Sequence, residues 1–243
     1  MAAWTADAAA LTIFFGTFIA SWLVELYCGP DSKRCPLFET AVVSYPPHCA
    51  VAAERGGLGD PALSVGSLQF AAALPYLARR FSLLPIVSTF LGVASFLFHA
   101  HGTDVHHRLD LTGVVLLAPA VLDCVLAFAF LPLPRRAALF LVPLVLALAT
   151  YPRSLMVYSV SGVYTALILG VLWANRGELT AGFLAGTLQL VVGIVLIFVG
   201  NGDAYWTCIP SQLAEPHYWG HFFSAAGVTL ISRGWPKSLY SPL

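Results

Sequence analysis

The stretch that decides the fold is Ser95 to Gly113, SFLFHAHGTDVHHRLDLTG. Here an apolar run ends in a group of histidines and aspartates, and the next apolar run begins at once. The chain as a whole has only 10% charged residues, yet it gathers these titratable groups at one boundary between two hydrophobic segments. The place of this boundary in the fold therefore bears directly on what chemistry the chain can perform.

The composition around this stretch is that of a polytopic membrane protein. Hydrophobic residues make up 58% of the 243 residues, and the mean hydropathy is +0.81. Soluble domains are roughly 45–50% apolar even when glycine is counted. Twelve Lys and Arg balance twelve Asp and Glu, and no basic block typical of nucleic-acid binding is present. We therefore expect an integral, multi-pass membrane protein with no nucleic-acid partner.

Apolar stretches of about 17–25 residues, the length that spans a bilayer, indicate eight helices. Several breaks between them are turns of a few residues, so successive helices should be antiparallel neighbours. Asp7 and the lack of basic residues at the start favour a retained first helix over a cleaved signal peptide. The fold class predicted is an all-α polytopic membrane helix bundle. Its expected helices are Ala9–Tyr27, Ala62–Ala78, Leu83–Ala100, Leu111–Leu131, Ala137–Tyr151, Leu155–Ala174, Ala181–Asn201 and Tyr218–Ile231.

Basic residues and cysteines indicate which side each loop faces. If all eight segments span, one side collects more Lys and Arg, and the positive-inside tendency makes that side cytoplasmic. The histidine-rich boundary then lies on the lumenal or extracytoplasmic side, in the endoplasmic reticulum or Golgi if the cell is eukaryotic. Disulfides persist on that side, and their three possible pairings stay open, as does the alternative that some cysteines are simply small apolar residues. The cysteines expected there are Cys28, Cys35, Cys49 and Cys208, whereas Cys124 falls within a span.

Two pairs of residues at helical spacing should meet on this outer side. Ser95 and His99 are four apart at the end of the third segment, so they share one helical face. His217 and His221 have the same spacing at the start of the last segment. Asp110 opens the fourth segment and should return to the depth of His99. Three neutral imidazoles suit zinc and leave a fourth position for water, which is the arrangement of a catalytic site.

The chemistry expected at such a site is hydrolysis of an acyl bond. Zinc lowers the pKa of its bound water to about 7, which produces a nucleophile at neutral pH. Asp110 would take the proton and deliver it to the leaving group, and Ser95 would donate a hydrogen bond to the developing oxyanion. Each residue also has an ordinary structural explanation: Asp110 as a helix N-cap, Ser95 as a partner of its own helix backbone. A functional site is favoured because the three histidines, Asp110 and Ser95 are all expected at the same depth in the membrane.

The remaining titratable groups of this region are assigned differently. His101, Asp104, His106 and His107 are expected to lie in a solvated loop between two helices, although any of these histidines could replace a ligand. Asp123 falls in the middle of the fourth segment, with no partner evident from the sequence.

The order of these residues resembles the alkaline ceramidase family. That family belongs to a superfamily of seven-helix membrane hydrolases that also includes adiponectin-type receptors and the Per1-like enzymes that remodel GPI lipids. The pattern is S-x3-H, an Asp eleven residues after that histidine, and H-x3-H opening the final helix. Three phrases are similar to the family: RGGLGDPALSVGSLQF at 55–70, GVASFLFHA at 92–100 and GNGDAYWTC at 200–208. The resemblance runs from about Arg55 to Ser232.

The resemblance implies a division of the chain and a set of roles. Residues 1–61 would be an extra N-terminal transmembrane helix and a cysteine-containing lumenal loop, 62–234 the seven-helix catalytic core, and 235–243 a cytoplasmic tail. The activity implied is zinc-dependent hydrolysis of the N-acyl amide bond of ceramide or a related lipid, hence sphingolipid metabolism. The zinc ligands implied are His99, His217 and His221, with Asp110 as proton-transfer group and Ser95 assisting. The acyl chain is expected among Phe96, Phe98, Phe222 and Phe223.

Two departures from the family pattern define the alternatives. The region SYPPHCAVAAERGGLGDP at 44–61 lacks the acidic cluster that binds calcium in eukaryotic alkaline ceramidases. Its oxygen ligands are too few for a Ca²⁺ site, which counts against calcium dependence. Around Asp110 the chain reads LDLTGV (109–114), and the glycine of this sequence is closer to the pattern of the Per1 and receptor branches. The alternatives are a Per1-like lipid ester hydrolase and a receptor-like or structural zinc-binding protein with little turnover.

Overall fold

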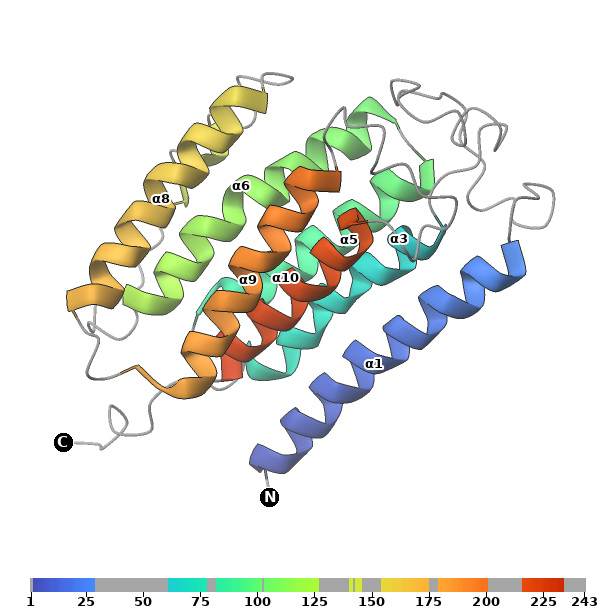
Figure 1. Ribbon diagram of the computed structural model, residues 1–243, viewed down its shortest axis with the longest axis horizontal. Helices are drawn as coiled ribbons and strands as arrows, with labels where there is room; N and C mark the ends of the chain where they lie inside the picture. The colour runs from blue at the N-terminus through green and yellow to red at the C-terminus, as the bar shows by residue number, and fades with distance from the viewer. Residues whose placement is uncertain are drawn as a thin grey trace.

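The fold is known from a computed structural model, which describes residues 2–28, 61–77, 82–101, 103–126, 140–141, 143–145, 154–174, 179–200 and 216–233. Within these ranges the chain forms helices and no strand, which confirms the predicted all-α class. The helices, drawn in Figure 1, are α1 (Ala2–Cys28), α3 (Pro61–Ser67), the 3-10 helix η3 (Leu68–Tyr76), α5 (Leu84–His101), α6 (Asp104–Leu126), α8 (Ser154–Ala174), α9 (Ala181–Gly200) and α10 (Pro216–Arg233).

Three of the described helices are long and apolar enough to cross a membrane: Trp4–Cys28, Leu84–His101 and Val105–Cys124. Large apolar side chains also lie on the outside of the bundle, where lipid rather than water would solvate them; Leu26 and Leu188 are 75% and 65% exposed. These helices fit membrane association. The expected fifth span, Ala137–Tyr151, lies largely outside the described residues, and the eight-span topology stays a prediction.

The helices run alongside one another, with α1 and α8 at opposite margins of the bundle (Figure 1). The segment formed by α3 and η3 packs against α1, α5 and α10, while α6 lies between α5 and α8. One apolar core joins helices from distant parts of the sequence; it includes Leu84, Val121, Phe183 and Val228. The bundle therefore brings the end of α5 and the start of α10 within reach of each other through the central α3–η3 segment.

The central segment matches the predicted helix Ala62–Ala78 but changes type within it. The α-helix ends at Ser67, and the chain continues as a 3-10 helix with Pro75 inside it. Proline has no N–H to donate and clashes with an α-helical carbonyl four residues earlier, which disfavours an α-helix at this position. At the junction the backbone of α5 comes very close, since a Cβ on Gly92 would lie 2.8 Å from the Ser67 carbonyl oxygen.

Helices α9 and α10 form an antiparallel pair with glycines at their contact. A Cβ on Gly220 would lie 2.9 Å from the carbonyl oxygen of Gly193, and a Cβ on Gly186 would lie 2.8 Å from that of Gly227. Helix pairs in membranes use small residues in this way, because close approach of the two backbones gives packing and polar contacts that lipid does not replace. The start of α10, which carries two of the predicted ligands, is therefore held directly against α9.

The first turns of α6 differ from the prediction. The helix begins at Asp104 rather than Leu111, because Thr103 caps it: the Thr103 side-chain oxygen accepts from the N–H of His106 at 3.3 Å. The prediction of a solvated loop was therefore wrong for His106 and His107, which lie on a helix, and His101 is the last residue of α5. Asp110 lies in the second turn of α6 and is not the N-cap of that helix.

Two cysteines, Cys28 and Cys124, lie in the described residues. Cys28 is disulfide-bonded, and it packs near Ala100, the neighbour of His99. Cys124 is buried and is not part of a disulfide. Cys35, Cys49 and Cys208 lie outside the described residues, so the pairing stays open. A disulfide-bonded cysteine therefore lies at the same end of the bundle as the histidine-rich boundary.

Candidate metal centre

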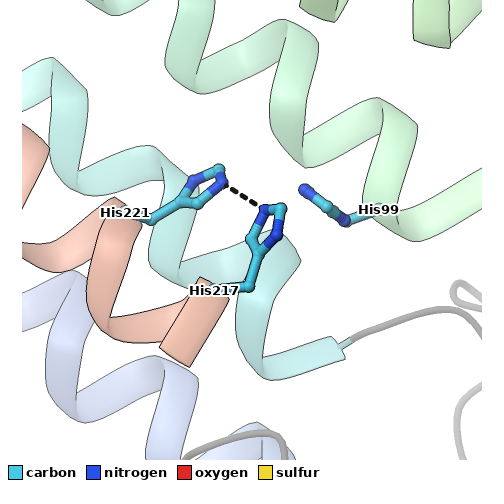
Figure 2. A group of neighbouring side chains, drawn as sticks. All are labelled: His99, His217 and His221. Carbon is cyan, nitrogen blue, oxygen red and sulfur yellow. Dashed lines mark hydrogen bonds between the residues drawn. The ribbon is translucent and has the colours of Figure 1, made fainter. Parts of the chain in front are cut away.

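Three histidines from two helices meet at one end of the bundle. His99 lies in the last turn of α5, and His217 and His221 lie one turn apart at the start of α10. One ring nitrogen from each lies within 4.8 Å of those of the other two. Figure 2 shows the three imidazoles pointing toward a common centre. The convergence predicted from helical spacing and membrane depth is therefore confirmed for these three residues.

The geometry of the three rings fits a divalent transition metal ion. The Nε2 atoms of His217 and His221 are 3.0 Å apart. A tetrahedral zinc ion with zinc–nitrogen bonds of about 2.0–2.1 Å holds its nitrogens about 3.3 Å apart, close to this separation. The His99 ring centroid lies 5.4 Å from each of the other two. Imidazole nitrogens are ligands that zinc, copper, nickel and iron accept, so these residues can hold a metal ion.

The environment of the rings is mostly dry. His99 is 3% exposed and His221 is 7% exposed, whereas His217 is only partly buried. The ring of Phe70, on η3, meets His221 edge to face at 6.1 Å between centroids. A low local polarity strengthens electrostatic interactions at a site. His217 is therefore the most accessible of the three rings.

A serine that the sequence analysis did not single out contacts this group. Ser67, fully buried at the end of α3, places its Oγ 3.1 Å from Nδ1 of His221. The same oxygen donates to the carbonyl of Leu63 at 2.8 Å and lies 3.2 Å from Oγ of Ser95. The only sequence signal was a serine within an apolar segment at the depth of the histidines, which is too common to identify a contact.

Asp110 and Ser95, the predicted catalytic residues, lie beside the histidines. The Ser95 hydroxyl is within hydrogen-bonding reach of the Asp110 carboxyl group, and that carboxyl also interacts electrostatically with His99. Ser95 is fully buried, and Asp110 is partly buried. The structure thus brings together all five side chains that the sequence analysis grouped. Their roles in catalysis stay a prediction.

The other histidines in the described residues, His101, His106 and His107, lie outside the candidate metal-binding group. His101 and His106 face each other with centroids 5.5 Å apart, and His107 stacks on Phe98 at 4.6 Å. Phe98 in turn lies beside His99, with centroids 5.2 Å apart. Two populations of histidine are therefore present at this end of the bundle, as expected, although the second one belongs to helices rather than to a loop.

The aromatic residues expected around an acyl chain occupy different surroundings. Phe98 is next to the histidines, whereas Phe222 packs against Phe14 and Phe18 of α1, with centroids 5.0 and 5.2 Å apart. Next to them, the Ser21 hydroxyl and the Tyr218 hydroxyl share a buried hydrogen bond of 2.7 Å between α1 and α10. Helix α1 therefore contacts the turn of α10 that lies between the two histidines.

Comparison with known proteins finds no match for this chain among models of protein families, curated proteins or solved structures. The resemblance to alkaline ceramidases therefore depends on the residues and phrases quoted above.

Proposed function

We propose that the chain is a membrane-embedded, zinc-dependent hydrolase that cleaves the N-acyl amide bond of ceramide or a related lipid. In this proposal α1 is an extra helix beside a seven-helix core. The observation that carries it is the grouping of a serine–carboxylate pair with three imidazoles, within reach of one another, at one end of apolar helices. A structural metal site needs no such pair, whereas hydrolysis needs a group that moves protons.

Three imidazole ligands leave a coordination position for a fourth ligand, which is typical of catalytic zinc sites. When bound, the zinc ion would polarise the acyl carbonyl and make a water molecule more acidic. His99, His217 and His221 would hold it. The exposed apolar faces of the surrounding helices would let a lipid approach from the bilayer, since such a substrate does not leave the hydrocarbon phase readily.

Asp110 would carry the proton between the two halves of the reaction. Its carboxylate takes the proton of the attacking water as the new C–O bond forms, and it then protonates the nitrogen as the C–N bond breaks. The products are a fatty acid and an amine. The proton count balances, because the proton that leaves the water ends on the amine.

Ser95 would respond to each of these proton transfers. While Asp110 is ionised, the Ser95 hydroxyl can donate to it. Once Asp110 is protonated, its own O–H can donate to the serine oxygen, and the serine proton can turn to the carbonyl oxygen that gains negative charge. A hydroxyl has a single proton to donate, so this exchange lets Ser95 stabilise the oxyanion only after the base has acted.

The proposal places this chemistry on the lumenal or extracytoplasmic side, in the endoplasmic reticulum or Golgi of a eukaryotic cell. Its support is the disulfide-bonded Cys28 near His99, since disulfides persist in oxidising compartments.

The test is a lipid-hydrolysis panel on the purified full-length chain in detergent, together with its zinc content. We expect about one zinc ion per chain, lost in the double variant His217→Ala/His221→Ala, and release of fatty acid from ceramide. Release from ester lipids alone would replace the amide substrate by an ester. Bound zinc without hydrolysis of any lipid in the panel would contradict the enzyme and favour a receptor-like protein. Absence of zinc from the wild type would overturn the site.

A further inference from the structure

Ser67 contacts the candidate metal centre from a helix that supplies none of the predicted ligands. It lies at the junction of α3 and η3 and is 154 residues from His221 in the sequence. Its Oγ is 3.1 Å from Nδ1 of His221, on the opposite side of the ring from the nitrogen that faces His217. The buried serine is therefore placed to hydrogen-bond to the nitrogen of His221 that does not face His217.

The hydrogen-bond partners of Ser67 determine which nitrogen of His221 carries the proton. A serine hydroxyl has one proton, and here it is directed to the carbonyl of Leu63 at 2.8 Å or to Oγ of Ser95 at 3.2 Å. With the proton so directed, the serine oxygen accepts from His221, an arrangement that favours the tautomer with its proton on Nδ1. The lone pair of the imidazole is then on Nε2, which faces the Nε2 of His217 at 3.0 Å.

The position of Ser67 is fixed by close packing. A Cβ on Gly92 of α5 would lie 2.8 Å from the Ser67 carbonyl oxygen and 3.1 Å from Cβ of Phe70. This approach of α5 is what brings Ser95, one turn after Gly92, to within 3.2 Å of Ser67. A continuous set of contacts then runs from His221 through Ser67 and Ser95 to Asp110.

We infer that Ser67 is a positioning residue of the metal centre, which holds His221 with its proton on Nδ1 and its Nε2 turned to the ion. The inference rests on the proposed function only in that the three histidines bind a metal. Metal-bound histidines generally donate their other N–H to an acceptor, most often a carboxylate, a backbone carbonyl or water, and loss of that acceptor weakens metal binding about 10–100-fold. Ser67 is the partner of His221 in this chain.

The experiment is a titration of the metal-free, full-length protein in detergent with Co²⁺ and with Zn²⁺. Ser67→Ala should bind each ion about 10–100-fold more weakly than the wild type, with a changed visible spectrum of the cobalt form. Ser67→Thr keeps the hydroxyl and should bind close to the wild type. The matched control is Ser88→Ala on α5, because Ser88 is also fully buried but donates within its own helix, to the carbonyl of Pro85 at 3.1 Å.

A purely structural role of Ser67 predicts a different pattern. It would lower the melting temperature of the metal-free protein and leave metal affinity unchanged. Wild-type affinity and an unchanged cobalt spectrum in Ser67→Ala would overturn the inference while leaving the metal site intact. Failure of the wild type to bind either ion would instead contradict the proposed function.

A second measurement tests the inference if Ser67→Ala does not fold. Nitrogen-15 spectra of histidine-labelled protein with bound zinc should show the His221 ring with a proton on Nδ1 and zinc on Nε2, both in the wild type and in Ser67→Thr, which keeps the hydroxyl. A proton on Nε2 of that ring in the wild type would contradict the role of Ser67.

Discussion

Asp110 and Asp123 lie toward opposite ends of the same apolar helix, α6, yet their surroundings differ in kind. Asp110 lies beside the hydroxyl of Ser95 and interacts with the imidazole of His99. Asp123 is fully buried. Burial does not distinguish the two, because neither residue is exposed. What separates them is the chemistry of their partners.

Two partners of Asp123, Ser82 and Leu83, immediately precede the first turn of α5. Oδ2 of Asp123 accepts from the backbone N–H of Leu83 at 2.9 Å and from the Ser82 hydroxyl at 3.1 Å. The N–H groups at a helix start have no partner within the helix, and the positive end of the helix dipole favours a carboxylate there. Asp123 is thus a capping residue supplied by a neighbouring helix. Asp110, in contrast, contacts groups that can exchange protons or hold a metal.

The largest expected effect comes from the same substitution at both positions. Asp110→Asn should lower lipid hydrolysis about a hundredfold to ten-thousandfold, because the amide cannot accept the proton of the attacking water. Its zinc content and melting temperature should stay close to those of the wild type. Asp123→Asn should keep turnover per folded molecule, because its partners are structural. Fatty-acid release, normalised to folded protein measured by size-exclusion chromatography, compares the two.

A parallel loss of activity in the two variants would contradict the difference in role between Asp110 and Asp123. Equal loss with retained zinc would mean that Asp110 acts through the fold, as Asp123 does, and would remove the proposed proton carrier.

Two glycines of α10, the helix that carries His217 and His221, lie close to the backbone of α9. A Cβ on Gly220 would lie 2.8 Å from the backbone nitrogen of Ile197, and one on Gly227 would lie 2.6 Å from the carbonyl oxygen of Gly186. Each alanine variant should lose free energy of unfolding at the upper end of about 1–3 kcal/mol, because backbone cannot move aside as a side chain can. Unfolding by SDS in mixed micelles measures this loss.

Only the first of these two variants should also disturb the metal centre. Gly220 precedes His221, so Gly220→Ala should weaken zinc binding more than Gly227→Ala does. Gly162→Ala on α8 is the matched control, since no atom lies within 4 Å of the added Cβ. A Gly162→Ala variant that loses as much stability as Gly220→Ala would contradict the assignment of the loss to close packing.

Removal of the Asp123 carboxylate should have a stability effect without a metal effect. Asp123→Ala leaves the partly buried N–H of Leu83 without this acceptor, which costs about 1–3 kcal/mol. The loss should appear in SDS unfolding, and zinc affinity should stay at the wild-type value. Ser82→Ala keeps the bond from the N–H of Leu83 to the carboxylate, but it removes the donor to Asp123 and the acceptor of the Leu84 N–H at 3.2 Å. Its loss should not exceed that of Asp123→Ala, because hydrogen bonds to a charged group are the stronger ones. A larger loss for Ser82→Ala would show that the carboxylate is not what holds the start of α5.

Much of this arrangement could be predicted from the sequence, because long apolar runs define membrane helices and a four-residue spacing defines a helical face. The meeting of His99 with His217 and His221 followed from these two regularities. Contacts that depend on tertiary packing did not follow. Asp123 finds its partners 40 and 41 residues away, and a buried serine such as Ser67 looks the same in the sequence whether it bonds its own helix or a metal ligand.

The early start of α6 was missed for a different reason. The pattern Thr103–Asp104 is a normal helix N-terminus, with a hydroxyl cap followed by an acidic first turn. A boundary placed by hydropathy falls after these polar residues, because an amphipathic first turn does not appear in a hydropathy average.

The smallest expected effect concerns Asp7, which is less buried than Asp123. Its carboxylate accepts from the Tyr76 hydroxyl at 2.9 Å and pairs with Arg233 at 3.2 Å, which joins α1 to η3 and α10. The Arg233 side chain is 56% exposed, so the ion pair should contribute only about 0.2–1 kcal/mol and less at high salt. A double-mutant cycle of Asp7→Asn and Arg233→Gln, measured by SDS unfolding, gives this coupling. A coupling as large as the Asp123→Ala loss would mean that the partners of a carboxylate do not determine how much it contributes to the free energy of unfolding. It would also make the attachment of α1 a principal determinant of the stability of the bundle.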